Sequence, residues 1–422
     1  MQSHEFEHAF GRREFLKLAG AAGLSWLTPL AQLLSQQAEK QKQPAKSLIV
    51  LWLQGGPSQL ETFDPHPGKS IGGDTRAIAT RAKNIQIAEG LPLLAEQMQH
   101  ISLVRSLVSK EGDHERGTYF VKTGFRPDPT AVHPAIGAVL CKELPVGKTE
   151  IPRHVSILPG QWPARGGFLG AEYDAFKTYD PINKVPDTVA RVPAERDRQR
   201  VEDLKVVEAA FARGRRRQTQ PAVVQGQLEA ARTMMTSEQL KAFDVMLEPE
   251  RTRKSYGDTP FGRGCLAARR LIEVGVRCVE VTLDGWDSHV DNARIHRDQN
   301  VILDAAFAAL IRDLEERKLL DRTVVLCAGE FGRTPRINPA GGRDHWPTGF
   351  SCALAGGGIR GGLAIGSTDP DGGPPREEEA RQVQDVHATI LKSFGLEYDK
   401  LRQTPIGRTA RLTGRPIDDL LS

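Results

Sequence analysis

The sequence predicts an α/β fold in which helices cover both faces of a mainly parallel β-sheet. Residues 47–53 (SLIVLWL) and 323–328 (TVVLCA) are apolar throughout, which is typical of strands buried on both faces. A strand at 277–283 and an amphipathic helix at 301–319 precede the second of these runs. Strand, helix and strand in this order imply a right-handed crossover between parallel strands. At 422 residues the chain can bury the core of one large domain or two ordinary ones.

The remaining elements follow between turns that glycine and proline mark. Residues 356–362 (GGGIRGG) form a glycine-rich turn, and the β-like residues 363–365 predict a hairpin with the strand before it. Hydrophobic periodicity predicts further strands at 100–108, 154–158 and 350–355, and helices at 91–99, 114–122, 261–274 and 385–394.

A helical insertion is expected between about 189 and 255. The composition shifts there to charged, helix-favouring residues. Leu204, Val207 and Phe211 recur at helical spacing, which indicates amphipathic helices. We expect these helices to pair against the sheet domain.

The first 45 residues differ from the rest. Arg12 and Arg13 open the motif RREFLK before a modestly apolar segment at 18–34, a pattern that resembles a twin-arginine export signal. The alternative is an amphipathic helix with an ordinary arginine pair. We expect residues 1–45 to be signal and linker, and 46–422 to be the functional domain. The signal predicts the Tat translocase as a partner, a periplasmic or other extracytoplasmic location, and membrane contact only through the signal if it is not cleaved.

The charge and the cysteine pattern argue against nucleic-acid binding, a disulfide framework and a thiolate metal site. The net charge of +4 is small, and basic and acidic residues are interleaved, so no nucleic-acid partner is expected. The five cysteines are widely spread and contain no C-x-x-C motif. They predict small core residues rather than a disulfide framework or a thiolate metal site.

Four polar clusters follow predicted strands, at the sheet edge where ligands bind in open α/β folds. A lone cluster is most simply a turn held by hydrogen bonds from side chains to the backbone. Four clusters at one edge predict a single crevice for a metal and an anion. The clusters are Ser58/Glu61/Asp64/His66, Asp113/His114/Glu115/Arg116, Asp284/Asp287/His289/Asp291 and Glu330/Arg333/Arg343/Asp344/His345.

The third cluster indicates which metals to expect. Asp287 and His289 are two residues apart, so in an extended chain they point the same way and can share one cation. Mixed imidazole and carboxylate ligands favour a divalent Zn, Mn or Fe ion over Ca.

A nucleophile and an anion clamp would complete an active site. Ser58 follows a sharp glycine-proline turn, where its hydroxyl could attack beside a metal or, equally, cap a helix. Arg116, Arg333 and Arg343 could clamp a tetrahedral oxyanion, although surface ion pairs are the usual role of an arginine.

Five segments together resemble the bacterial DUF1501 family, within the alkaline phosphatase and sulfatase superfamily. The resemblance implies a doubly wound, alkaline phosphatase-like sheet with two divalent metals. It also implies hydrolysis of phosphate or sulfate esters through a Ser, Thr or formylglycine nucleophile. The segments are LWLQGGPSQLETFDPHPG (51–68), HERGTYFVKTG (114–124), TPFGRGCLAARRLIEVGVRCVEVTLDGWDSHVDN (259–292), AGEFGRTPRIN with GRDHWP (328–347) and GGGIRGGLAIGSTD (356–369).

The resemblance also implies roles for particular residues. Asp287 and His289 occupy the region of the superfamily's Asp-x-x-x-His metal motif, with a shorter spacing. Glu330 falls where the superfamily has Asp-His, and His345 matches its late metal histidine.

Two positions depart from the superfamily. Residues 54–56 (QGG) replace the metal aspartate at the end of the first strand, so Glu61 or Asp64 would have to substitute. Aligning TG at 123–124 with the sulfatase T-G places His114 at the nucleophile position, and the C-x-P-x-R signature is missing. The nucleophile is then Ser58 or His114, or water attacks directly.

The sequence thus predicts an exported, metal-dependent hydrolase of a small-molecule or glycan phosphate or sulfate ester. Two alternatives stay open: a non-catalytic metal- or anion-binding protein of the same fold, and a structural partner of an exported complex. The predicted metal ligands are Asp64, Asp287, His289, Glu330 and His345, the catalytic candidates are Ser58 and His114, and the anion-binding candidates are Arg116, Arg333 and Arg343.

Overall fold

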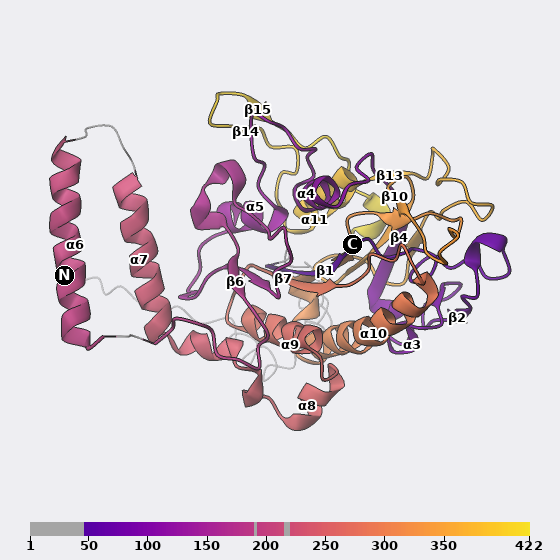
Figure 1. Cartoon of the computed structure of the whole chain (residues 1–422), viewed down its shortest axis with the longest axis horizontal. Helices are drawn as coiled ribbons and strands as arrows, with labels where there is room; N and C mark the ends of the chain where they lie inside the picture. Colours follow the sequence, from indigo (N-terminus) through magenta and orange to yellow (C-terminus); the bar gives the residue numbers. More distant parts are fainter. Residues whose placement is uncertain (1–45, 190–191, 215–219) are drawn as a thin grey trace, which may run out of the picture. The chain divides into compact units, whose positions relative to one another are not determined.

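The computed structural model describes residues 46–189, 192–214 and 220–422 (Figure 1). The predicted export signal with Arg12 and Arg13 lies outside these residues. Across the described ranges, no helix is both long and apolar enough to cross a membrane.

The core of the fold is a nine-stranded sheet in the order β12-β4-β11-β8-β1-β7-β5-β6, with β13 also paired to β4. β11 is antiparallel to both β4 and β8, and the other pairs are parallel. The predicted fold class, a mostly parallel sheet with helices, is therefore confirmed. The strands are β1 (Ser47–Gln54), β4 (Ile101–Val108), β5 (His154–Ile157), β6 (Phe176–Thr178), β7 (Cys278–Asp284), β8 (Thr323–Ala328), β11 (Phe350–Ala355), β12 (Ala364–Ile365) and β13 (Arg381–Gln382).

Helices and short strands complete the described chain. The helices are α3 (Pro92–Ala95), α4 (His114–Thr123), α5 (Ile136–Glu143), α6 (Ala194–Gly214), α7 (Gln220–Thr236), α8 (Glu250–Ser255), α9 (Pro260–Glu273), α10 (Asn292–Glu316) and α11 (Val383–Ser393). Three two-stranded pairs lie outside the main sheet: β2 (Ala77–Ala79) with β3 (Gln86–Ala88), β9 (Gly332–Arg333) with β10 (His345–Trp346), and β14 (Arg402–Gln403) with β15 (Thr409–Ala410).

Each face of the sheet carries its own apolar core because side chains alternate along β1. Ile49, Leu51 and Leu53 join the core shared with α9 and α10. Leu48 and Trp52 join the core shared with α4, α5 and α11. Figure 1 shows α9 and α10 on one side of the sheet and α4 and α11 on the other.

Local signals fix the ends of the helices near the site. Asp113 caps α4, because its carboxylate accepts the amide N–H of Arg116 at 3.1 Å. Gly124 ends the same helix in the left-handed conformation, as the glycine predicted. Thr259 caps α9 in the same way, with Pro260 in the first helical turn.

The predicted hairpin after β11 is wrong. β12 pairs with β4 in parallel, through Ala364 and Leu103, and not with β11. The glycine-rich segment instead crosses the start of β4, where the amide of Gly362 donates to the carbonyl of Ile101 at 2.9 Å. A Cβ on Gly361 would lie 2.3 Å from the carbonyl oxygen of Gln99, so only glycine allows this crossing.

Other predicted helices differ in extent, and the one expected at 301–319 is α10, which begins earlier, at Asn292, and ends at Glu316. The predicted helix at 91–99 is interrupted: α3 covers only its start, and a 3₁₀ turn follows at Met98–His100.

In the insertion, none of the α6 side chains that the structure describes is buried, whereas Met234 of α7 joins the core of the sheet domain. An ion pair between Asp197 and Arg232 links the two helices.

The buried histidine His387 should make folding pH-dependent. Its Nε2 donates to the carbonyl of Val121 at 2.8 Å, and burial lowers the pKa of His387 from 6.5 to about 4. The unfolded chain therefore binds a proton in this window that the folded chain does not. Stability is full above pH 6.5 and declines as the pH falls towards 4, by about 3 kcal/mol from this group.

We predict that His387→Gln reduces this decline by about 3 kcal/mol while leaving other titrating groups unchanged. Urea unfolding of both proteins at several pH values measures it. Parallel pH profiles for the two proteins would contradict the assignment.

Candidate metal centre

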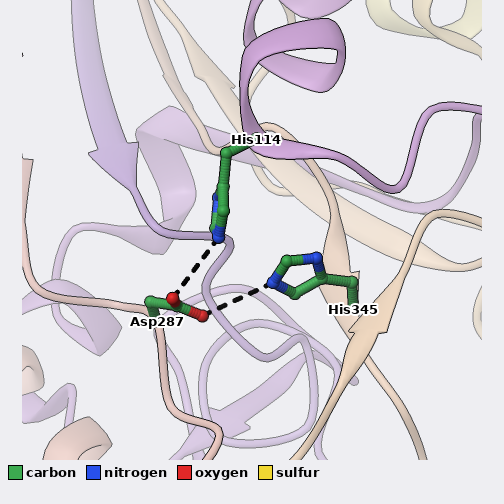
Figure 2. A group of neighbouring side chains, drawn as sticks. All are labelled: His114, Asp287 and His345. Carbon is green, nitrogen blue, oxygen red and sulfur yellow. Dashed lines mark ion pairs between the residues drawn. The ribbon is translucent and has the colours of Figure 1, made fainter. Parts of the chain in front are cut away.

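Three polar loops meet at one edge of the sheet. His114 begins α4 after β4, Asp287 follows β7, and His345 lies in β10 beyond β8. β4 and β8 run in the same direction because both are antiparallel to β11, and β7 and β8 are both parallel to β1. Their carboxyl ends therefore share an edge. Figure 2 shows the imidazoles of His114 and His345 both pointing at the carboxylate of Asp287.

The donor atoms have the spacing of a metal site. Asp287 Oδ1 lies 3.2 Å from His289 Nε2 and 3.5 Å from His345 Nε2, and the two nitrogens are 3.0 Å apart. Four donors at about 2.0–2.1 Å from a Zn²⁺ ion would lie roughly 3.3 Å from one another. These three atoms thus match one face of a tetrahedral site.

His114 lies on the other side of Asp287. Its Nε2 is 3.4 Å from Asp287 Oδ2. His114, Asp287 and His345 place ligand atoms within 4.8 Å of one another, a grouping that could hold a metal ion. The structure therefore brings together one carboxylate and three imidazoles.

Glu330 fixes the orientation of His114. This carboxylate is fully buried at the end of β8, and its Oε1 lies 2.8 Å from His114 Nδ1. The hydrogen bond raises the pKa of His114, and burial opposes it. In neutral His114 the proton therefore sits on Nδ1, so Nε2 presents a lone pair to Asp287.

The other two histidines are fixed in the same way. His345 Nδ1 lies 2.7 Å from the carbonyl oxygen of Gly112, which can only accept, so Nδ1 carries the proton. His289 Nδ1 lies 3.0 Å from Asp344 Oδ1. Burial lowers the pKa of His345, although the bond to Gly112 opposes that effect. In their neutral forms, with the proton on Nδ1, all three imidazoles therefore direct Nε2 inward.

Two observations fit a cation at this position. The Nε2 atoms of His289 and His345 lie 3.0 Å apart and within 3.5 Å of Asp287 Oδ1, a spacing that fits two ligands of one cation and equally a hydrogen bond in which one Nε2 carries a proton. The second oxygen of Glu330, Oε2, is buried and makes no hydrogen bond, a condition that a nearby cation would satisfy. The donor set is that of Zn, Mn or Fe.

Arg333 holds Asp287 in place. Its guanidinium is fully buried and donates to Asp287 Oδ1 at 2.6 Å, and also to the carbonyls of Gly55 and Gly56. Partial burial alone would raise the pKa of Asp287, but Arg333, with His114 and His289 nearby, lowers it below its ordinary value. The carboxylate is therefore ionised and able to bind a cation.

The turn after β1 is built to approach this group closely. Gly55 has φ of +115°, and a Cβ there would lie 2.5 Å from the Asp287 amide nitrogen. Its own amide donates to Glu330 Oε1 at 2.9 Å. Gly56 packs against Phe331, whose buried ring lies 4.4 Å from that of His345. Gly55 and Gly56, in the QGG segment at 54–56 that stands in place of an aspartate, thus position neighbouring residues.

The first predicted cluster does not join the donor group. Ser58 is fully buried, and its amide donates to His296 Nε2 at 2.8 Å. Asp64 is also buried, and its Oδ2 accepts from both the amide and the hydroxyl of Thr368 at 2.8 Å. Among the described contacts of these two residues, none reaches the three histidines or Asp287.

The three arginines predicted to bind an anion all bond to protein groups. Arg343 is fully buried and donates to Glu61 and to backbone carbonyls, and Arg333 is engaged as described above. Arg116 is half exposed and pairs with Glu111 at 2.7 Å. Of the three, only Arg116 can still reach solvent.

Sequence reasoning missed the partners that orient the histidines. Asp344 was part of a predicted cluster, but its pairing with His289 depends on a turn in which Asn338 bonds to both. Gly112 contributes only its backbone carbonyl, which leaves no signal in a sequence. Glu330 was predicted as a metal ligand, and the structure shows its Oε1 bonded to His114 Nδ1 and its Oε2 without a hydrogen bond.

The fold and this site define an α/β protein with a candidate divalent-metal centre at the carboxyl edge of its sheet. The chain belongs to the DUF1501 family, described as proteins of unknown function, whose model matches residues 45–421. The resemblance to this family is thereby confirmed. No curated protein matches the sequence.

Several solved structures are similar at low identity. They include a sulfatase from Pseudoalteromonas sp. (12% identity, 92% of this chain and 76% of that chain, TM-score 0.41). They also include the C-terminal periplasmic domain of EcEptC from Escherichia coli in complex with Zn (12%, 90% and 96%, 0.40). A third is the alkaline phosphatase of the Antarctic bacterium TAB5 (13%, 84% and 99%, 0.36). At these scores the likeness assigns no activity to this chain.

We predict that His345→Ala weakens Zn²⁺ binding by at least ~100-fold, because it removes one of the four candidate ligands directly. Isothermal titration of the metal-free protein measures the dissociation constant. His66→Ala is the matched control, since His66 bonds to Thr368 and not to the donor group. Equal losses in both variants, or none in His345→Ala, would count against the site.

Proposed function

We propose that this chain is a metal-dependent hydrolase of phosphate or sulfate esters. The observation that carries the proposal is the convergence of Asp287 with three histidines whose outer nitrogens are all committed to acceptors. Such a set is prepared to bind a divalent cation, because no donor has to change its tautomer first.

The metal would be held by Asp287, His114, His289 and His345. A bound Zn, Mn or Fe ion would supply Lewis acidity towards an ester oxygen. The residues around it have separate tasks: Glu330 and Asp344 hold protons on the outer nitrogens, and Arg333 keeps Asp287 ionised. Glu330 would bind the metal, as predicted, only through Oε2, the oxygen that makes no hydrogen bond.

The site is open enough for an ester to reach. Asp287 and His289 are both nearly half exposed, at 47% and 45% of their side-chain surface, while Phe331 closes the inner wall. A small-molecule or glycan ester can therefore approach from solvent without a channel. Of the three predicted arginines, Arg116 alone is exposed to solvent, so it is the one available to an anionic group.

Of the two predicted nucleophiles, the geometry supports His114 over Ser58. Ser58 has no exposed surface, and its backbone amide, not its hydroxyl, donates to His296 Nε2. His114 presents Nε2 to the donor group, but the same lone pair is needed to bind the metal. We therefore favour direct attack of water on the ester, because this route needs neither side chain as the nucleophile.

Export through the Tat translocase is part of the proposal. It rests on Arg12 and Arg13 in the sequence and on the fact that a metal-binding fold suits transport in the folded state. The functional location would be the periplasm or another extracytoplasmic space.

The buried position of Ser58 favours a second candidate function. With this hydroxyl enclosed, the protein would bind a metal and an anion without turning over an ester. The two candidates share the metal centre and differ only in catalysis.

We predict that the metal-loaded full chain hydrolyses an aryl phosphate or an aryl sulfate, and that Asp287→Ala and His345→Ala each lower the rate at least ~100-fold. Release of the aryl alcohol is followed by absorbance, before and after chelation. Asp371→Ala, which alters an exposed ion pair with Lys69, is the control. Binding of metal without turnover of either ester would select the second candidate, and absence of both would reject the proposal.

A further inference from the structure

One short segment supplies two parts of the candidate centre. Residues 109–113 connect β4 to α4. The carbonyl of Gly112 in this segment accepts the proton of His345 Nδ1 at 2.7 Å, and His114 follows directly as the first residue of α4. A shift of this segment would therefore misplace two imidazoles at once.

Glu111 anchors the segment. Its side chain is only 3% exposed, and its Oε2 accepts from Arg116 Nε at 2.7 Å while Oε1 accepts from Arg126 Nε at 2.5 Å. The hydrogen bond from Arg116 is the main cause that lowers the pKa of Glu111, so the carboxylate stays ionised. Its amide donates to Ser109 Oγ at 3.1 Å, which tightens the turn.

The same segment is also hydrogen-bonded just beyond the strand that carries His345. The amide of Ser109 donates to the carbonyl of Pro347 at 2.8 Å, two residues after His345. Gly112 lies against the ring of the same proline. Glu111 thus joins α4, through the Arg116 side chain, to the turn that faces β10, and Asp113 caps the same helix through the Arg116 amide.

We propose that Glu111 is a positioning residue for the metal centre, which it orients through Gly112 and the start of α4. This inference rests on the proposed function only in taking the donor group to bind a metal. Arg116 and Arg126 are 51% and 57% exposed, so both stay hydrated if the carboxylate is removed. The main consequence of its loss is therefore a looser segment rather than unpaired buried charges.

The first test is metal affinity. Glu111→Ala is expected to weaken Zn²⁺ binding by about 10-fold, the lower end of the effect of losing a direct outer partner, because Glu111 acts on His345 only through Gly112. Glu143→Ala is the matched control, because Glu143 is also largely buried and bonds to two cations, Lys400 at 2.6 Å and Arg402 at 3.5 Å. The control should bind Zn²⁺ like the wild type. Equal affinities for wild type and Glu111→Ala, or equal losses in both variants, would overturn the proposal.

The second test separates positioning from general loosening. In the metal-free wild type, ¹⁵N NMR should find the proton of His345 on Nδ1, and in Glu111→Ala on a mixture of Nδ1 and Nε2. Glu111→Gln keeps one acceptor oxygen and should restore most of the wild-type pattern. If Glu111→Ala does not fold, Arg126→Gln, at an exposed position, tests the same contact.

The two tests also distinguish this inference from the proposed function. A wild-type protein that binds no Zn²⁺ would reject the proposed metal centre, while the tautomer of His345 would still decide the role of Glu111. A His345 tautomer that is the same in wild type and Glu111→Ala would overturn the inference even if Zn²⁺ binds.

Discussion

The hydrogen bonds on the outer side of three histidines are the constraint on which the site depends. Glu330, Asp344 and the carbonyl of Gly112 each hold the proton of one Nδ1, so the Nε2 atoms converge as lone pairs around Asp287. In the free protein the Nε2 atoms of His289 and His345 lie 3.0 Å apart, the distance of a hydrogen bond in which one of them carries a proton. A bound cation in place of that proton would make both nitrogens ligands, which is the physical reason to regard the site as a metal centre.

The loops that carry these residues lie together because β4, β7 and β8 end at the same edge of the sheet. Arg333 then ties the loops to one another: a buried guanidinium needs its full set of acceptors, and it finds them in Asp287 and in backbone carbonyls such as that of Gly56. Removing a single partner of a buried charge typically costs several kcal/mol, so the position of Asp287 is coupled to the stability of the fold. Residues expected to clamp a substrate anion, Arg333 and Arg343, serve this structural purpose.

The sequence predicted the fold class and the region of the site more successfully than the roles within it. Apolar runs at β1 and β8 marked buried strands, and polar residues after β4, β7 and β8 marked the edge at which ligands bind. Periodicity carries no information about which strand lies beside which, so the pairing of β12 with β4 in place of a hairpin was missed. Nor does it reveal burial of a polar side chain, which is why Ser58 was expected at the surface of the site and is enclosed. A carbonyl such as that of Gly112 has no sequence signature at all.

Anomalous X-ray scattering at the zinc edge, from crystals of the wild type soaked in Zn²⁺, would locate a metal bound at this edge of the sheet. We expect one strong peak at about 2.0–2.1 Å from His289 Nε2, His345 Nε2 and an oxygen of Asp287, with His114 Nε2 on the remaining side. The same peak should disappear in crystals of Asp287→Ala. A peak at another place, such as the buried cluster around Asp64, or no ordered zinc in the wild type, would contradict a metal centre at Asp287 and the three histidines.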